Sequence, residues 1–235
     1  MQLAVQLYTL RHALDEDFDG TLAALAEAGV REVELAGLHG RSPAAVRAAL
    51  DAAGLVACSA HVPLDGFDGA AEAAATLGAP TVVVPWVEPP ETAEEADAAV
   101  ARIVAASEIA ADADLGFAYH NHDFEFRTGL WSRIVAAELP HELDVGWLMA
   151  AGGDPVAVLG ELAGRCPLVH AKDMRRRADG SWEDVIAGDG EADWPAIVAA
   201  AKAAGATHLI VELDNPSEHP VDDVALSLAT LRDAL

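Results

Sequence analysis

Short β-branched runs alternate with alanine-rich segments along the whole of this chain. Eight such runs have the composition of strands: Gln2–Leu7, Glu32–Ala36, Leu55–Ala60, Thr81–Trp86, Leu115–His120, Glu142–Val145, Leu168–Ala171 and His208–Leu213. The segments between them have helical composition, as in Gly20–Ala28, Pro43–Ala53, Thr92–Ala113 and Trp194–Ala204. Strict alternation of this kind predicts parallel strands. Eight strand–helix units are the number that a closed (β/α)8 barrel requires, so we predict an α/β fold of that type.

Glycine and proline mark the helix ends that this pattern implies. Ser42-Pro43 and Asp154-Pro155 are typical of helix starts, where a capping side chain precedes a proline in the first turn. Several helices are expected to stop at a glycine just before the next strand, because glycine enters the left-handed region without strain. These glycines are Gly29, Gly54, Gly78 and Gly205.

A doubly wound open sheet is the alternative architecture. It is weakened because Tyr8-Thr9-Leu10-Arg11 follows the first strand, where a glycine-rich phosphate loop would be expected. Gly188-Asp189-Gly190 does not supply that loop, since it lies in a long connection, Met174–Asp193, and not at a strand–helix turn. No linker or break in composition divides the chain, so we expect one domain over residues 1–235.

The composition narrows the class of protein. Hydrophobic residues make up 52% of the 235 residues, which is enough to bury a core, and no apolar stretch is long enough for a membrane span. The N-terminal residues MQLAVQLYTLRH lack the basic and apolar segments of a secretion signal. Two cysteines do not form a disulfide framework, so a reducing cytoplasm is the expected location.

The formal net charge of −25 opposes binding to nucleic acid or to an anionic membrane, because both require clustered cations. We interpret the excess of acidic residues either as a well-solvated surface or as an adaptation to high salt, where screening reduces the repulsion between the negative charges. The one basic run is Arg175-Arg176-Arg177. We interpret this run either as a grip for a substrate phosphate or as an exposed basic loop.

Polar side chains stand where the predicted strands end, which is the face that carries the active site in a parallel αβ barrel. His120, Asp144, His170 and Glu212 come from four consecutive strands, and neighbouring strands lie about 5 Å apart. A lone carboxylate in a buried run needs a partner, and a divalent metal ion is one. Taken alone, His120 or His170 could be a hydrogen-bonded interior histidine. Asp144 or Glu212 alone could be a helix cap or a salt-bridge member. Together the four predict a metal site.

Four other residues are predicted to line a substrate pocket at the same strand ends. They are Gln6, Glu34, His61 and Trp86, with the Trp86 ring offering an apolar face. Plain barrel packing for Trp86, a salt bridge for Glu34 and a structural role for His61 are the alternatives.

Five segments resemble the xylose isomerase-like family of sugar phosphate isomerases and epimerases. In chain order they are Phe117–Phe126 (FAYHNHDFEF), Glu142–Trp147 (ELDVGW), His170–Asp173 (HAKD), Gly188–Trp194 (GDGEADW) and Val211–Asp214 (VELD). The resemblance implies a single TIM barrel that holds one divalent cation, such as manganese, cobalt, magnesium or zinc. It places ligand roles on Asp144, His170 and Glu212.

The sequence departs from the family at His120, where many members have a glutamate. In those members that glutamate forms an acid/base pair with the residue that matches Glu212. Here Glu212 remains as the base, and we expect His122 or Lys172 to act as the acid. The expected reaction is proton abstraction next to a sugar carbonyl through an enediolate, with the metal ion polarising the carbonyl.

The resemblance therefore implies a sugar or sugar phosphate isomerase or epimerase. The expected base, Glu212, and the expected acid, His122 or Lys172, are different kinds of group. A keto-sugar or inosose dehydratase (lyase) is therefore the near alternative. An abasic-site endonuclease, disfavoured by the net charge, and a sugar-binding barrel without turnover are remote ones. The sequence leaves open which sugar is the substrate and whether the chain forms a homo-oligomer.

Overall fold

Eight parallel strands close into a barrel in the computed structural model, which describes all of residues 1–235. Around the barrel the strands follow the order β1-β10-β7-β6-β5-β4-β3-β2. This closed parallel barrel confirms the predicted (β/α)8 fold. The strands are β1 (Gln2–Gln6), β2 (Glu32–Ala36), β3 (Val56–His61), β4 (Thr81–Val84), β5 (Gly116–His120), β6 (His141–Asp144), β7 (Leu168–Ala171) and β10 (His208–Val211).

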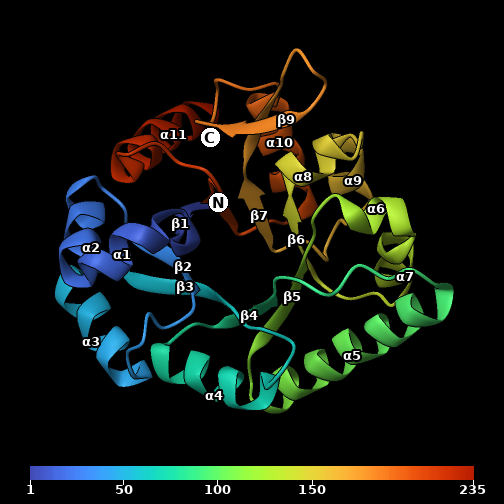
Figure 1. The fold of residues 1–235 in the computed structure, drawn as a ribbon, viewed down its shortest axis with the longest axis horizontal. Coiled ribbons are helices and arrows are strands. Elements are labelled where there is room, and N and C mark those ends of the chain that lie inside the picture. The colour runs from blue at the N-terminus through green and yellow to red at the C-terminus, as the bar shows by residue number, and fades with distance from the viewer.

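Helices form a ring around the strands (Figure 1). Where the capping signals are clear, the predicted bounds are confirmed: α3 (Pro43–Ala53) begins after Ser42, whose Oγ accepts the Ala45 N–H, and ends at Gly54 with φ 71°. No helix is both long and apolar enough to cross a bilayer. The other helical elements are η1 (Leu7–Leu10), α1 (Arg11–Glu16), α2 (Phe18–Glu27), α4 (Phe67–Leu77), α5 (Ala93–Asp112), α6 (Phe124–Thr128), α7 (Leu130–Ala136), α8 (Val145–Ala150), α9 (Pro155–Glu161), α10 (Trp194–Ala204) and α11 (Pro220–Ala234).

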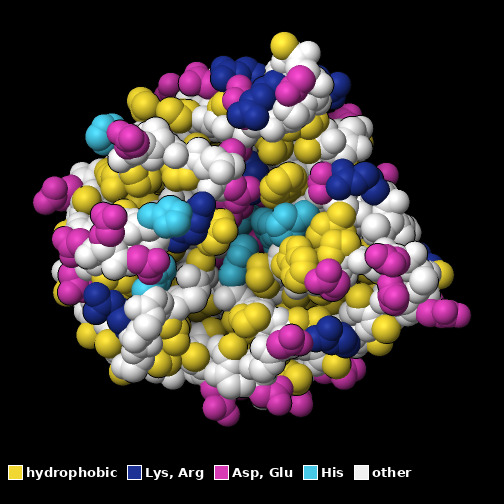
Figure 2. All heavy atoms as spheres, viewed as in Figure 1, with side chains coloured by type: hydrophobic (Ala, Val, Ile, Leu, Met, Phe, Trp, Pro, Cys, Tyr) yellow, Lys and Arg dark blue, Asp and Glu magenta, His cyan; other side chains and the backbone are white.

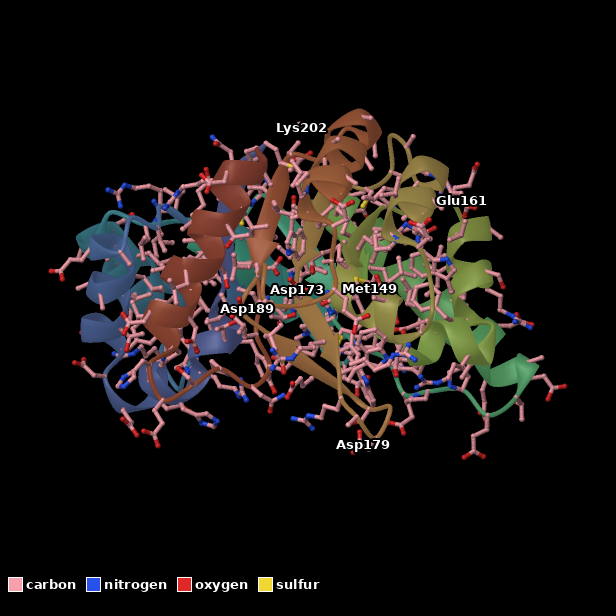
Figure 3. All side chains as sticks on the ribbon, turned by 90° about the horizontal axis from the view of Figure 1, so that it is seen from above. Met149, Glu161, Asp173, Asp179, Asp189 and Lys202 are labelled. Carbon is pink, nitrogen blue, oxygen red and sulfur yellow. The ribbon has the colours of Figure 1, made fainter.

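The connection Met174–Asp193, predicted as one long loop, contains a hairpin instead. Its antiparallel strands are β8 (Asp173–Arg176) and β9 (Trp182–Val185). Figure 3 shows Asp179, in the turn between these strands, at the end of the hairpin that projects beyond the barrel. The hairpin adds a wall beside the carboxyl ends of the barrel strands.

Asp173 anchors the segment that follows the hairpin. This buried carboxylate accepts hydrogen bonds from the backbone N–H groups of Gly188, Gly190 and Ala192 and from the Trp194 indole Nε1. A Cβ at Gly190 would collide with the Asp173 carboxylate, so only glycine permits this approach. The motif GDGEADW is thus explained as a structural loop wrapped around Asp173, which Figure 3 labels in the interior of the molecule.

The barrel interior changes from apolar to polar along the strands. A small separate core of Ala4, Cys58, Val83, Ala118, Leu168 and Ile210 fills one level. Because inward side chains recur every two residues, the next inward positions after Leu168 and Ile210 are His170 and Glu212. Both of these are buried. The polar residues therefore lie one level beyond this apolar layer, nearer the carboxyl ends of the strands.

Candidate active site

A cavity of about 490 Å³ opens at the carboxyl ends of the barrel strands. Its lining includes His120, His122, Lys172 and Glu212. Figure 2 shows the hollow at the centre of this face, with histidine and acidic side chains at its bottom. The size is within the range of small-molecule sites.

The structure brings the four predicted metal ligands together. His120 ends β5, Asp144 ends β6, His170 lies in β7 and Glu212 follows β10. These strands are neighbours in the barrel, and Asp144 pairs directly with His170 in the register. One donor atom from each of the four side chains lies within 4.8 Å of the others. Two imidazole nitrogens and two carboxylate oxygens at such distances could share one cation.

The Asp144 carboxylate tests whether a cation fits there. Its Oδ1 accepts the Trp147 N–H at 2.8 Å and caps α8, as the alternative interpretation of this residue expected. Its Oδ2 is buried and has no hydrogen-bond partner. That oxygen lies 3.9 Å from His170 Nδ1 and 4.0 Å from His120 Nε2. This buried oxygen makes no hydrogen bond and faces two imidazoles, with Lys172 Nζ 3.4 Å away, so a divalent metal ion would fit as its partner.

Two buried glutamates hold these imidazoles from the opposite side. Glu34 Oε1 lies 2.7 Å from His170 Nε2, and Glu142 Oε1 lies 3.1 Å from His120 Nδ1. Carboxylates bonded to the outer nitrogen of a ligating histidine fix the ring and its tautomer. Sequence reasoning missed Glu142 in this role. The sequence does carry a signal for Glu142: it lies two residues before Asp144, so both side chains are on the same face of β6.

Two of the residues predicted to line the pocket are in fact below it. Gln6 and Glu34 are fully buried and do not line the cavity, and Gln6 Nε2 donates to Glu34 Oε1 at 2.7 Å. This corrects the expectation of substrate contact, because one layer of side chains separates them from the opening. His61 does line the cavity, and its Nε2 lies 2.9 Å from Glu142 Oε1. Trp86 lines it as well and is 46% exposed, which excludes plain packing.

A second set of possible metal ligands lies in this lower layer. It consists of His61, His120, Glu142 and His170, and its donor atoms also lie within 4.8 Å of one another. It shares both central histidines with the upper set. Each set has two members that line the cavity: His61 and His120 in the lower set, and His120 and Glu212 in the upper set. Only the upper set includes Glu212, whose Oε2 lies 3.0 Å from Lys172 Nζ, so it is the set that joins a cation to a possible base and acid.

Lys172 is the one lysine or arginine among the carboxylates of the site. It is 1% exposed, and its Nζ lies 2.7 Å from Asp214 Oδ2, 3.0 Å from Glu212 Oε2 and 3.4 Å from Asp144 Oδ2. Burial acts to lower the pKa of Lys172, but these carboxylates outweigh it and raise that pKa. Lys172 is thus protonated at neutral pH. Sequence reasoning also missed Asp214, whose signal is its spacing of two residues from Glu212.

Glu212 is held in the ionised form. Burial acts to raise its pKa, but the charges of Lys172 and His170 hold the pKa well below its ordinary value. Burial raises the pKa of Asp144 to about 7, with Lys172 acting in the opposite direction. The site therefore places an ionised carboxylate 3.0 Å from a protonated amine at the floor of the cavity.

His122 lies just past the end of β5 and lines the cavity. Burial, assisted by the charge of Lys172, lowers the pKa of His122 to about 4, so its ring is neutral. Its backbone N–H donates to Glu125 Oε2 at 2.8 Å, and Tyr119 Oη donates to Glu125 Oε1 at 2.9 Å. The buried Glu125 therefore fixes the turn that presents His122, a role that sequence reasoning did not assign.

The arginines of the basic run Arg175–Arg177 contact residues of their own hairpin. Arg175 and Arg177 both bond to Glu183, at 2.8 and 2.9 Å, and the Arg176 guanidinium stacks over the Trp182 ring. None of the three lines the central cavity. The interpretation of this run as an exposed basic segment is favoured over a phosphate grip.

Comparison with known proteins decides the family. A family model described as the xylose isomerase-like TIM barrel matches residues 22–234, nearly the whole chain. The chain belongs to this family. The resemblance predicted from its five sequence segments is thereby confirmed. A search of the curated proteins finds no match for this xylose isomerase-like barrel.

Several solved structures share the fold. A sugar phosphate isomerase/epimerase from Parabacteroides distasonis ATCC 8503 superposes with a TM-score of 0.86 at 20% identity, covering 98% of this chain and 97% of that one. The IOLI protein, whose structure contains a zinc atom, gives 0.77 at 18% identity and covers 100% and 98%. An L-ribulose 3-epimerase gives 0.73 at 16% identity and covers 99% and 95%. At these identities the likeness establishes the fold of this xylose isomerase-like barrel.

Proposed function

We propose that this protein is a divalent-metal-dependent sugar isomerase or epimerase that removes a proton next to a carbonyl and forms an enediolate. One observation carries the proposal: the set of four possible metal ligands includes Glu212, which lies 3.0 Å from Lys172 Nζ, and both residues line a cavity of about 490 Å³. The sugar and epimerase names of structures with the same fold support it.

The donor set favours some of the expected metals over others. His120 and His170 would each supply a nitrogen, while Asp144 and Glu212 would each supply an oxygen. Zinc and cobalt accept imidazole nitrogen, manganese binds carboxylate oxygen more readily than imidazole, and magnesium takes oxygen ligands and keeps several waters. The zinc atom in the IOLI structure is consistent with this preference. When bound, the ion would polarise the substrate carbonyl and make the adjacent C–H acidic.

The chain supplies an acid and a base of different kinds. The Glu212 carboxylate takes the proton from the carbon next to the carbonyl. The Lys172 ammonium, which is protonated and 3.0 Å away, donates to the oxygen on which charge develops. His122, neutral and at the edge of the same cavity, orients a substrate hydroxyl. Trp86 and the half-exposed Tyr8 offer apolar faces to the sugar ring.

A keto-sugar or inosose dehydratase (lyase) is the second candidate, and the identity of residue 120 favours keeping it. A histidine stands there, so the pair of glutamates needed for symmetric proton removal and return is absent. A single carboxylate base with an ammonium acid also suits elimination: Glu212 takes the α proton and Lys172 protonates the departing hydroxyl, which leaves as water. Nucleic acid is disfavoured, because Lys172 is the only lysine or arginine that lines the cavity and it is bound to carboxylates.

Proton exchange from solvent tests the proposal most directly. The protein is loaded with manganese, cobalt or zinc and incubated in D₂O with a panel of ketoses, aldoses and inososes, and NMR follows the signal of the α proton. We expect that signal to disappear with at least one sugar, with isomer or dehydrated product distinguishing the two candidates. Protein stripped with a chelator is the control and should show no exchange. If no sugar exchanges with any of the three metals, the proposal is wrong.

A further inference from the structure

A second cavity, of about 520 Å³, lies beside the first. The hairpin forms much of it, because Met174, Arg177, Trp182, Glu183 and Asp184 all line it. Asp214 lines both cavities, so they meet at the residue that bonds Lys172. The catalytic chemistry proposed above makes no use of this space.

The indole of Trp147 separates the two cavities. Trp147 lines the second cavity, whereas His122 and Lys172 line the first. The Trp147 ring centre lies 5.5 Å from the His122 ring centre and 5.0 Å from Lys172 Nζ. A ligand in the second cavity would thus lie one side chain away from the proposed acid and base.

The second cavity is built into the fold rather than left between loose segments. Asp184 on β9 accepts the backbone N–H of Asn215 at 2.9 Å and its side-chain Nδ2 at 3.0 Å. The backbone N–H of Arg176 on β8 donates to Glu191 Oε1 at 2.9 Å. These bonds fix the hairpin to the segment after β10 and to the loop around Asp173.

The lining of the second cavity has the chemistry of a carbohydrate site. Trp147 and Trp182 both line it, and the ring faces that Lys172 Nζ and the Arg176 guanidinium leave uncovered would match the C–H face of a sugar ring. Asp123, Asp184, Glu183 and Asp214 offer carboxylate oxygens, and Asn215 an amide. The Trp147 Nε1 donor is buried and has no partner. Ligand hydroxyl groups could donate to these carboxylate oxygens.

The charges of the second cavity oppose a phosphate group. Four carboxylates line it, and its single cation, Arg177, is bound to Glu183 at 2.9 Å. An anion placed there would meet repulsion without a free positive partner. The ligand that fits is neutral and rich in hydroxyl groups.

We propose that the second cavity binds the second unit of an uncharged glycoside, whose keto-sugar unit occupies the first cavity. This inference rests on the proposed function for the identity of the first unit. It makes the natural substrate a neutral disaccharide or comparable glycoside and not a sugar phosphate.

Binding measurements on the manganese- or zinc-loaded protein test this inference. Calorimetry or saturation-transfer NMR compares lactulose, maltulose, isomaltulose and turanose, disaccharides in which one unit is a free ketose, with their constituent monosaccharides. We expect at least one disaccharide to bind about tenfold or more tightly than either of its units, because a buried aromatic contact carries that much affinity. In Trp182→Ala this advantage should disappear, and Trp182→Phe should retain most of it. Trp131→Ala, whose indole lies outside both cavities, is the matched control and should keep the advantage.

Two results would overturn the inference. One is that no disaccharide of the set binds more tightly than its units, or that the advantage survives in Trp182→Ala. The other is that glucose 6-phosphate binds more tightly than glucose, which would reveal an anion site. Solvent deuterium exchange is measured separately: exchange without a disaccharide advantage contradicts only the second cavity, and the advantage without exchange contradicts only the proposed chemistry.

Discussion

Replacing Glu212 with glutamine is expected to slow solvent deuterium exchange by about 10²- to 10⁴-fold, the contribution typical of a positioned base. Glutamine keeps the size and the polar contacts of the side chain but cannot take the proton. Its amide oxygen can still face the metal site, so we expect metal to remain bound with reduced affinity. The measurement is the exchange rate at saturating metal, followed by NMR with the best sugar of the panel.

Glu218→Gln provides the matched control for this variant. Glu218 is exposed in the segment after β10 and lines neither cavity, so its exchange rate should equal that of the unaltered protein. Circular dichroism of both variants establishes that the fold is intact. Substantial exchange by Glu212→Gln, with metal bound, would remove Glu212 from the role of base.

Replacing Lys172 with methionine should have the largest effect on stability. In the absence of metal, Asp144, Glu212 and Asp214 would lose the one cation that they share. Removing one partner from a buried ion pair typically destabilises a protein by about 3–5 kcal/mol. Added divalent cation should recover part of this loss, because a ligand that binds only the native state stabilises it. Urea unfolding near neutral pH, with chelator and with manganese or zinc, measures both effects.

The other lysine of the chain serves as the control. Lys202 is exposed on α10 and donates to the carbonyl oxygen of Leu235, so Lys202→Met should change the free energy of unfolding by less than about 0.5 kcal/mol. Equal losses in the two variants would show that Lys172 does not balance the buried carboxylates. Failure of the cation to stabilise Lys172→Met would show that no metal ion occupies this cluster.

The fold could be predicted where the chain carries local signals. The ranges Pro43–Ala53 and Trp194–Ala204 are confirmed to the residue, because capping side chains and a following glycine define both ends. The predicted strand Thr81–Trp86 instead ends at Val84, since Pro85 has no N–H for a strand ladder. The hairpin was missed because its strands are charged and lack β-branched runs, although Asp179-Gly180 is a turn signal.

The site could be predicted only as far as the ends of the strands. His120, Asp144 and His170 converge because neighbouring parallel strands end at the same level. The depth of each residue was harder to infer. Gln6 and Glu34 lie one layer below the cavity, since strand tilt and stagger around the barrel set the level of each inward side chain. That geometry depends on the closed barrel and has no local signature in the sequence.

The central claim is that one cation is held jointly by His120, Asp144, His170 and Glu212. Crystals of the protein loaded with manganese or zinc, with an anomalous-difference map at the metal edge, test it directly. We predict a single strong peak bonded to one atom of each of these four side chains, at about 2.0–2.2 Å for zinc. A peak in the lower layer, bonded to His61 and Glu142 instead of Asp144 and Glu212, would contradict the claim. So would a protein that exchanges substrate protons with no ion bound at either place.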